Sequence, residues 1–151
     1  GGTMHLKIIP DIVRDQDIRG MSDQDTVLDA AKNMTTLNIG AIVVVDGDDN
    51  LVGIVTERDM TRRVMAAGLD PRATALGEIM TKNPDTLAPD DSALDALELM
   101  RLREYRHLPV TDDRKVVGMV SVRDLYTAVK GALEKDIQET EAFVFGDRYG
   151  A

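Results

Sequence analysis

The same pattern of residues occurs twice in this chain, and the duplication constrains the fold more than any other feature. Residues 22–67 align with residues 88–132, most clearly where "GIVTERD" at 53–59 matches "GMVSVRD" at 118–124. The second copy is shorter in a turn, where "DDRKVVG" faces "DGDDNLVG", and turns tolerate such changes well. The fold must therefore contain two copies of one small supersecondary unit.

Each copy begins with a predicted amphipathic helix. Apolar residues recur at helical spacing, at Val27, Ala30, Ala31 and Met34 and again at Ala93, Ala96, Leu97 and Met100. Polar residues ahead of each helix can cap its first turn; the candidates are Ser22 or Asp25, and Asp90 or Asp91.

Two strands and a second helix follow in each copy. The first strand is "AIVVV" at 41–45 or "LPV" at 108–110, and the second is "LVGIV" or "VVGMV". The next helix starts in "TERDMTRRVMAA" or "SVRDLYTAVKGAL", and Gly68 and Gly131 are expected near the helix ends. The strands are apolar on both faces, so each sheet needs cover on both sides. One copy alone is too small to provide it. The sequence therefore predicts an α/β fold of two repeats, each a helix, a two-stranded hairpin and a second helix, packed sheet to sheet.

The predicted boundaries follow from this plan. They are a tag remnant and tail at 1–7, repeat 1 at 8–68, a linker with a short helix in "LGEIM" at 69–84, repeat 2 at 85–132, and a C-terminal helix and tail at 133–151. Phe143 and Phe145 in the last segment either pack on a partner or fray.

Composition narrows the possible partners. The formal net charge of −9 argues against a nucleic-acid partner, which needs clustered lysines and arginines. There is no cysteine, so disulfides, thiolate metal sites and a cysteine nucleophile are excluded. The longest apolar run, at 41–45, is far shorter than a membrane span. We expect a cytoplasmic protein with no membrane and no nucleic-acid partner.

The repeated hydroxyl-x-x-Asp pattern is the strongest chemical signal. Thr56 ends a strand, and Asp59 lies in the first turn of the following helix, where the helix dipole favours an anion. A carboxylate there can accept two hydrogen bonds from a ribose diol, while the hydroxyl donates to a ribose or phosphate oxygen. Arg58 and Arg123 precede the two aspartates and could reach phosphates. The alternative is a capping box, in which the two side chains only satisfy backbone donors.

Taken together, these features closely resemble a tandem pair of cystathionine-β-synthase (CBS) domains over residues 8–132. The resemblance rests on both glycine-apolar-hydroxyl-x-x-Asp runs, on the "RHLPV" strand with its aspartate, and on the doubling. It implies two β-α-β-β-α repeats related by a pseudo-twofold axis, with two clefts between them. It also implies a stand-alone sensor of adenine nucleotides (AMP, ADP, ATP, NAD or S-adenosylmethionine) and a homodimer.

The resemblance also implies a set of ligand-binding residues. One cleft would combine Ser121 and Asp124 with Gly20, Met21, Ile39 and Gly40, and the other would combine Thr56 and Asp59 with Thr86, Leu87, Tyr105 and Arg106. Arg106 and His107 would lie at the cleft mouth near phosphate.

Three alternatives are weighed against this hypothesis. Residues 46–57 resemble a calcium loop, but Leu51 occupies the position that requires glycine, so a hairpin turn is preferred. An enzyme would need a nucleophile with its base, a metal cluster or a glycine-rich phosphate loop, and the sequence shows none of these. The third alternative is a structural dimerisation module, with Met21 or Tyr105 filling the clefts, and the sequence does not decide against it. We expect a non-catalytic regulatory module that needs no cofactor, binds an adenosine nucleotide and signals to an unknown target in trans.

Overall fold

The structure, a computed structural model, describes residues 5–148 and their side chains as far as residue 144. The ends of the predicted terminal tails, 1–4 and 149–151, and the Phe145 side chain lie outside what is described. The described chain forms two compact units. The first-repeat unit comprises residues 17–86 and 109–118, and the second-repeat unit comprises residues 5–16, 87–108 and 119–148.

The first-repeat unit is built on a three-stranded antiparallel sheet in the order β1-β2-β3. β1 (Ala41–Val45) pairs with β2 (Leu51–Thr56), and β3 (Thr81–Lys82) pairs with β2 inside the predicted linker. Met21 makes a parallel bridge to Val44 of β1. The order of elements is therefore strand, helix, strand, strand and helix, as predicted.

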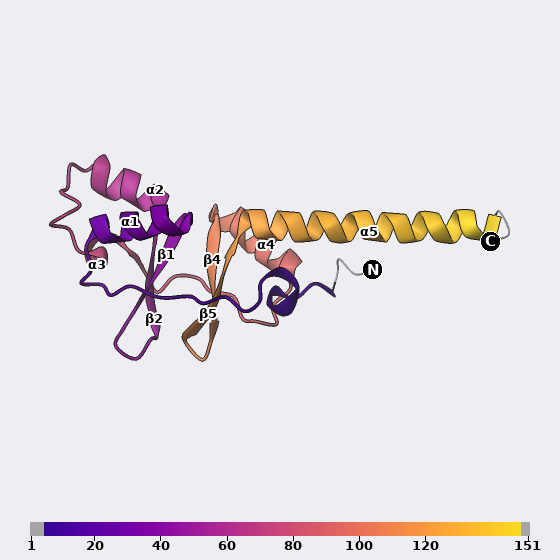
Figure 1. The fold of residues 1–151 in the computed structure, drawn as a ribbon, viewed down its shortest axis with the longest axis horizontal. Helices are drawn as coiled ribbons and strands as arrows, with labels where there is room; N and C mark the ends of the chain where they lie inside the picture. Colours follow the sequence, from indigo (N-terminus) through magenta and orange to yellow (C-terminus); the bar gives the residue numbers. More distant parts are fainter. Residues whose placement is uncertain (1–4, 149–151) are drawn as a thin grey trace. The chain divides into compact units, whose positions relative to one another are not determined.

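Three helical segments accompany this sheet. They are α1 (Val27–Leu37), α3 (Leu76–Ile79), and the short α2 (Glu57–Asp59), which continues as the π-helical turn η3 (Met60–Met65). α1 contacts β1, and α3 contacts β2 and η3 (Figure 1). The core consists of one apolar cluster: Met21, Val27, Ala30, Met34, Ile42, Val44, Val55, Val64, Leu76 and Ile79. The predicted helix at "LGEIM" is confirmed as α3.

The hairpin turn between β1 and β2 is held by Asp46. Its carboxylate accepts hydrogen bonds from the backbone N–H of Asp48 at 2.9 Å and of Asn50 at 3.0 Å. These bonds stabilise the charged form and lower the pKa of Asp46, the bond from Asn50 having the larger effect. The hairpin predicted at these residues is confirmed.

The second-repeat unit contains α4 (Ala93–Arg103) and α5 (Val122–Arg148), which pack together. β4 (His107–Asp112) and β5 (Lys115–Ser121) form a two-stranded hairpin whose tip belongs to the first-repeat unit. The N-terminal segment contains the π-helical turn η2 (Ile8–Ile12), which contacts α5 and whose Ile8 is fully buried.

The helix caps differ from those predicted. Thr26 caps α1 by accepting the Asp29 N–H at 3.2 Å, and Ser92 caps α4 by accepting the Asp95 N–H at 3.0 Å. Asp25 instead accepts the N–H of Ser22 in the preceding turn, and Asp91 does the same for Ala88. The predicted candidates therefore shape the turns before the helices rather than the helix starts.

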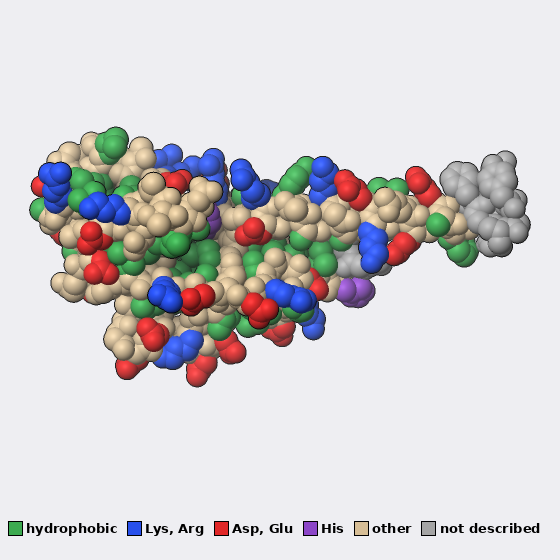
Figure 2. All heavy atoms as spheres, viewed as in Figure 1, with side chains coloured by type: hydrophobic (Ala, Val, Ile, Leu, Met, Phe, Trp, Pro, Cys, Tyr) green, Lys and Arg blue, Asp and Glu red, His purple; other side chains and the backbone are tan. Residues whose placement is uncertain are grey.

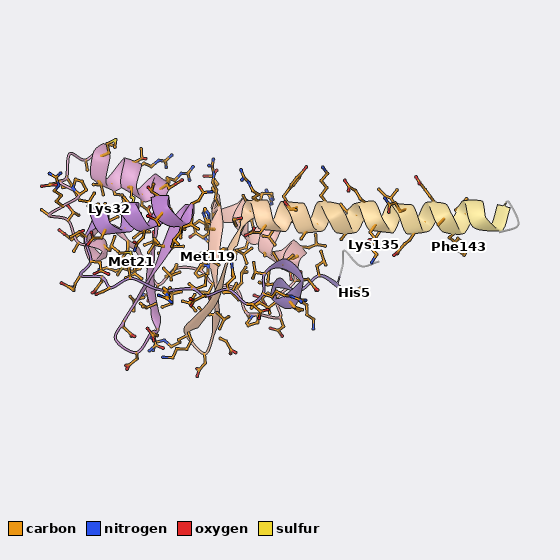
Figure 3. The ribbon with its side chains drawn as sticks, viewed as in Figure 1. His5, Met21, Lys32, Met119, Lys135 and Phe143 are labelled. Carbon is orange, nitrogen blue, oxygen red and sulfur yellow. The ribbon has the colours of Figure 1, made fainter. Side chains whose placement is uncertain are left out.

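The end of α5 also differs from the prediction. The helix continues through Gly131 to Arg148, so Gly131 lies in its interior. On the face shown in Figure 2, apolar and charged side chains lie interspersed along this helix. Lys135 and Phe143 project from it (Figure 3), and the Phe143 side chain is exposed. Within residues 5–148, no helix is both long and apolar enough to span a membrane.

Candidate functional site

Thr56 and Asp59 form a reciprocal pair where β2 ends. The Thr56 Oγ1 accepts the Asp59 N–H at 3.2 Å, and the Asp59 Oδ2 accepts the Thr56 N–H at 2.9 Å. This is a complete capping box. Arg63 approaches the other carboxylate oxygen, with its Nε 3.7 Å from Asp59 Oδ1.

Ser121 and Asp124 repeat this arrangement where β5 ends. The Ser121 Oγ accepts the Asp124 N–H at 3.0 Å, and the Asp124 Oδ2 accepts the Ser121 N–H at 2.9 Å. Asp124 is exposed, whereas the Asp59 side chain is only 14% exposed. Both repeats therefore present the same oriented carboxylate at the start of a helix.

The capping box does not exclude ligand binding. Each box uses only one carboxylate oxygen, and each hydroxyl accepts a bond while keeping its own proton to donate. The hydrogen bond to Oδ2 fixes the orientation of the whole carboxylate, and with it the direction of the second oxygen, Oδ1. In this geometry the cap orients the group that a ribose diol would contact.

Two of the four segments predicted to contact adenine, 39–40 and 105–106, lie beside the cap of their own repeat. α1 ends at Asn38 and α4 ends at Glu104, both with a left-handed backbone. In the residues that follow, the Gly40 carbonyl accepts the N–H of Glu57 at 3.1 Å, and the Arg106 carbonyl accepts that of Val122 at 2.9 Å.

Each contact joins the end of the first helix to the start of the second. The structure thus brings Ile39 and Gly40 to Thr56 and Asp59, and Tyr105 and Arg106 to Ser121 and Asp124. The opposite pairing, which the resemblance implies for each cleft, stays a prediction.

These contacts use backbone N–H groups that were expected to be available to an anion at the start of the second helix in each repeat. Of the first three N–H groups of α5, that of Val122 is bonded to Arg106 and that of Asp124 to Ser121. An anion there would depend mainly on side chains. Arg58, Arg106 and Arg123 are exposed, while His107, at the start of β4, is half-buried.

In each segment ahead of a first helix, one of the two predicted residues is exposed and the other is buried. Gly20 lies tightly against Val45, since an added Cβ would lie 2.5 Å from a Val45 methyl group. The Met21 backbone bonds to Val43 and Val45, and its side chain belongs to the core cluster (Figure 3). In the second repeat Thr86 is exposed and Leu87 is buried. Met21 is therefore a core residue of the first-repeat unit.

Two residues near these caps were not predicted. Gln16 pairs with the β5 backbone, donating to the Met119 carbonyl at 3.2 Å and accepting the Met119 N–H at 2.9 Å. Arg63 donates from Nη1 to the Ile79 carbonyl at 2.9 Å. Neither contact has a local signal, because the partners lie far apart in the sequence.

Comparison with known proteins identifies the family. The model of the CBS domain matches residues 11–66 and again residues 76–131. The chain belongs to the CBS-domain family. The tandem pair predicted from the duplication is confirmed, and so is the α/β class with two repeats. Pairs of CBS domains are regulatory modules that commonly bind adenine nucleotides.

Relatives and solved structures agree with this assignment. The mitochondrial CBS domain-containing protein CBSX3 of Arabidopsis thaliana is 39% identical over 81% of this chain and 61% of its own length. A solved protein with CBS domains from Burkholderia ambifaria MC40-6 is 37% identical, with a TM-score of 0.76 over 82% of this chain and 93% of its own. The hexameric CBS-CP12 protein from bloom-forming cyanobacteria is 28% identical, with a TM-score of 0.73 over 82% of this chain and 72% of its own.

Several curated relatives are longer than the aligned region. The chain covers 61% of CBSX3, and 23% and 21% of two further Arabidopsis CBS-domain proteins, CBSCBSPB2 and CBSCBSPB3.

Proposed function

We propose that this CBS pair is a regulatory module that binds an adenosine-containing nucleotide, AMP, ADP, ATP or NAD, and signals its presence to a partner protein. S-adenosylmethionine is a weaker candidate. One observation carries the proposal: both repeats end a strand in the same oriented hydroxyl and carboxylate, at Thr56 and Asp59 and at Ser121 and Asp124.

The chemistry of these groups suits a nucleotide. The outward carboxylate oxygen can accept hydrogen bonds from the ribose diol, and the hydroxyl can donate to a ribose or phosphate oxygen. The exposed guanidinium groups of Arg58, Arg106 and Arg123 can pair with phosphates. These cations matter because the chain carries a net charge of −9, which repels a nucleotide elsewhere on its surface.

Signalling requires that the nucleotide bind one conformation better than another. We propose that ligand binding changes the arrangement of the repeats, or of the subunits in a homodimer. A separate target protein would respond to this change, and the chain itself would catalyse no reaction. A cytoplasmic location stays a prediction, since the relative CBSX3 is mitochondrial.

A dimerisation module is the second candidate, and an apolar groove favours it. The groove has a volume of about 550 Å³ and is lined by Leu94, Leu97, Glu98, Met100, Arg101, Tyr105 and Val122. A second copy of the chain is the proposed occupant, because homodimers use one self-complementary patch and the related CBS-CP12 protein is a hexamer. Self-association and nucleotide binding are compatible.

Thermal unfolding of the nucleotide-stripped protein tests ligand binding. A nucleotide at about 100 times its dissociation constant should stabilise the protein by roughly 2.7 kcal/mol and raise the Tm by several degrees. Asp59→Asn or Asp124→Asn should reduce the shift. Asp95→Asn is the matched control, since Asp95 is the aspartate of a Ser-x-x-Asp cap at the start of α4 that does not end a strand. No shift with any of the five ligands at millimolar concentration would favour the dimerisation module. Turnover of ATP or NAD would contradict a purely regulatory role.

A further inference from the structure

The two repeated carboxylates differ in one respect that nucleotide binding should detect. Asp59 has a cation beside the oxygen that its cap leaves unused, because Arg63 Nε lies 3.7 Å from Asp59 Oδ1. Among the described residues, Asp124 makes no ion pair and is exposed. The oxygen that a ribose would contact is thus partly occupied in the first repeat and open in the second.

Arg63 is held in place by a second contact. Its Nη1 donates to the Ile79 carbonyl at 2.9 Å, at the end of α3. This bond connects η3 to α3 and leaves the guanidinium side chain 50% exposed. The arginine is therefore anchored next to Asp59 and is not a freely moving surface charge.

The second repeat has no equivalent cation. The two "Gly-x-x-hydroxyl-x-x-Asp" runs align Asp59 with Asp124, which places Ala128 at the position of Arg63. Ala128 lies on α5, four residues after Asp124. On a helix this is the spacing at which side chains face each other, so a methyl group stands where the first repeat has a guanidinium.

We propose that Arg63 is a built-in counter-ion that competes with nucleotide for Asp59, so that Asp124 provides the tighter of the two binding sites. This inference rests on the proposed function and specifies which repeat responds first. A ribose diol must displace the guanidinium to reach Asp59 Oδ1, whereas the same diol reaches Asp124 without losing an ion pair. The Arg63 side chain is 50% exposed, so the effect is modest, about five-fold or less in affinity.

Two separate variants, one at Arg63 and one at Ala128, test the proposal; we call them the exchange variants. Arg63→Gln removes the charge beside Asp59, and Ala128→Arg places a guanidinium beside Asp124. Isothermal titration with AMP, ATP and NAD measures the two affinities. We expect Arg63→Gln to tighten the weaker site by up to about five-fold. Ala128→Arg should weaken the tighter site by a similar factor.

Arg62→Gln is the control, since it removes the same charge from an exposed neighbour and should leave both affinities unchanged. Circular dichroism of each variant checks folding, and the two exchanges lie in different repeats, so one misfolded variant leaves the other informative. Weaker binding in Arg63→Gln would overturn the proposal and make Arg63 a phosphate ligand.

Unchanged affinities in both exchange variants would also overturn it, while leaving nucleotide binding itself intact. If the wild-type protein binds none of the three nucleotides, the proposed function fails and this inference fails with it.

Discussion

The Gln16 side chain pairs with the backbone of β5 in the way that a neighbouring strand would. Its amide makes both hydrogen bonds that an adjacent strand would make to Met119 of β5. Gln16→Ala removes both bonds and should lower the free energy of unfolding by about 1–2 kcal/mol, since one protein hydrogen bond typically contributes about 1 kcal/mol. Urea unfolding measures this. Gln24→Ala is the control, since the exposed Gln24 side chain donates to the neighbouring Asp23 carboxylate and not to a strand; an equal loss in both variants would refute the role.

Asp46 makes the stability of the hairpin depend on pH. Its pKa is lowered below 3.8 by the N–H groups of Asn50 and Asp48. The unfolded chain therefore binds this proton at a higher pH than the folded chain does. The resulting stability is present above 3.8 and is lost as the pH falls through the lower folded value. In acid, wild type should lose more stability than Asp46→Asn, whose amide oxygen can still accept these bonds. Parallel pH profiles of unfolding would contradict this.

At the scale of single elements, two glycines should respond oppositely to alanine. Gly131 lies inside α5 and an added Cβ meets nothing within 4 Å, so Gly131→Ala should stabilise the protein by up to about 1 kcal/mol. Gly68 also has open space but has φ +71°, which an alanine adopts only with strain. Gly68→Ala should therefore destabilise the protein. Thermal unfolding of both variants checks this, and the same sign in both would contradict it.

The elements that the sequence predicted well are those with strong local patterns. α1 and α4 follow from apolar residues at helical spacing, and the four longer strands follow from short continuous apolar runs. β3 is only two residues long, too short to show a pattern. α5 was predicted to end near Gly131, but one glycine costs only about 1 kcal/mol and strong helix formers follow it.

The candidate site was predictable in part, for the same reason. The Thr56–Asp59 and Ser121–Asp124 pairs are local and repeated. The contacts of Gln16 and Arg63 join residues 103 and 16 positions apart, and no spacing rule covers these.

At the scale of the whole molecule, self-association through the apolar groove predicts a dimer in solution. Leu94 lines the groove and is 41% exposed. Leu94→Glu should shift the protein toward monomer in light scattering, because a charge would be buried in the interface. Leu69→Glu, at a similarly exposed leucine outside the groove, should leave the mass unchanged. A monomeric wild type would contradict this interface.

Hydrogen exchange with and without saturating nucleotide tests the central claim most directly. With whichever of AMP, ADP, ATP or NAD binds, the account predicts slower exchange at 39–40, 56–59, 105–106 and 121–124, where the two repeats present their capped carboxylates. The hairpin turn at 46–50 should be unaffected. Protection confined to other segments, or none with any of these nucleotides, would show that the repeated hydroxyl-x-x-Asp pairs are helix caps alone.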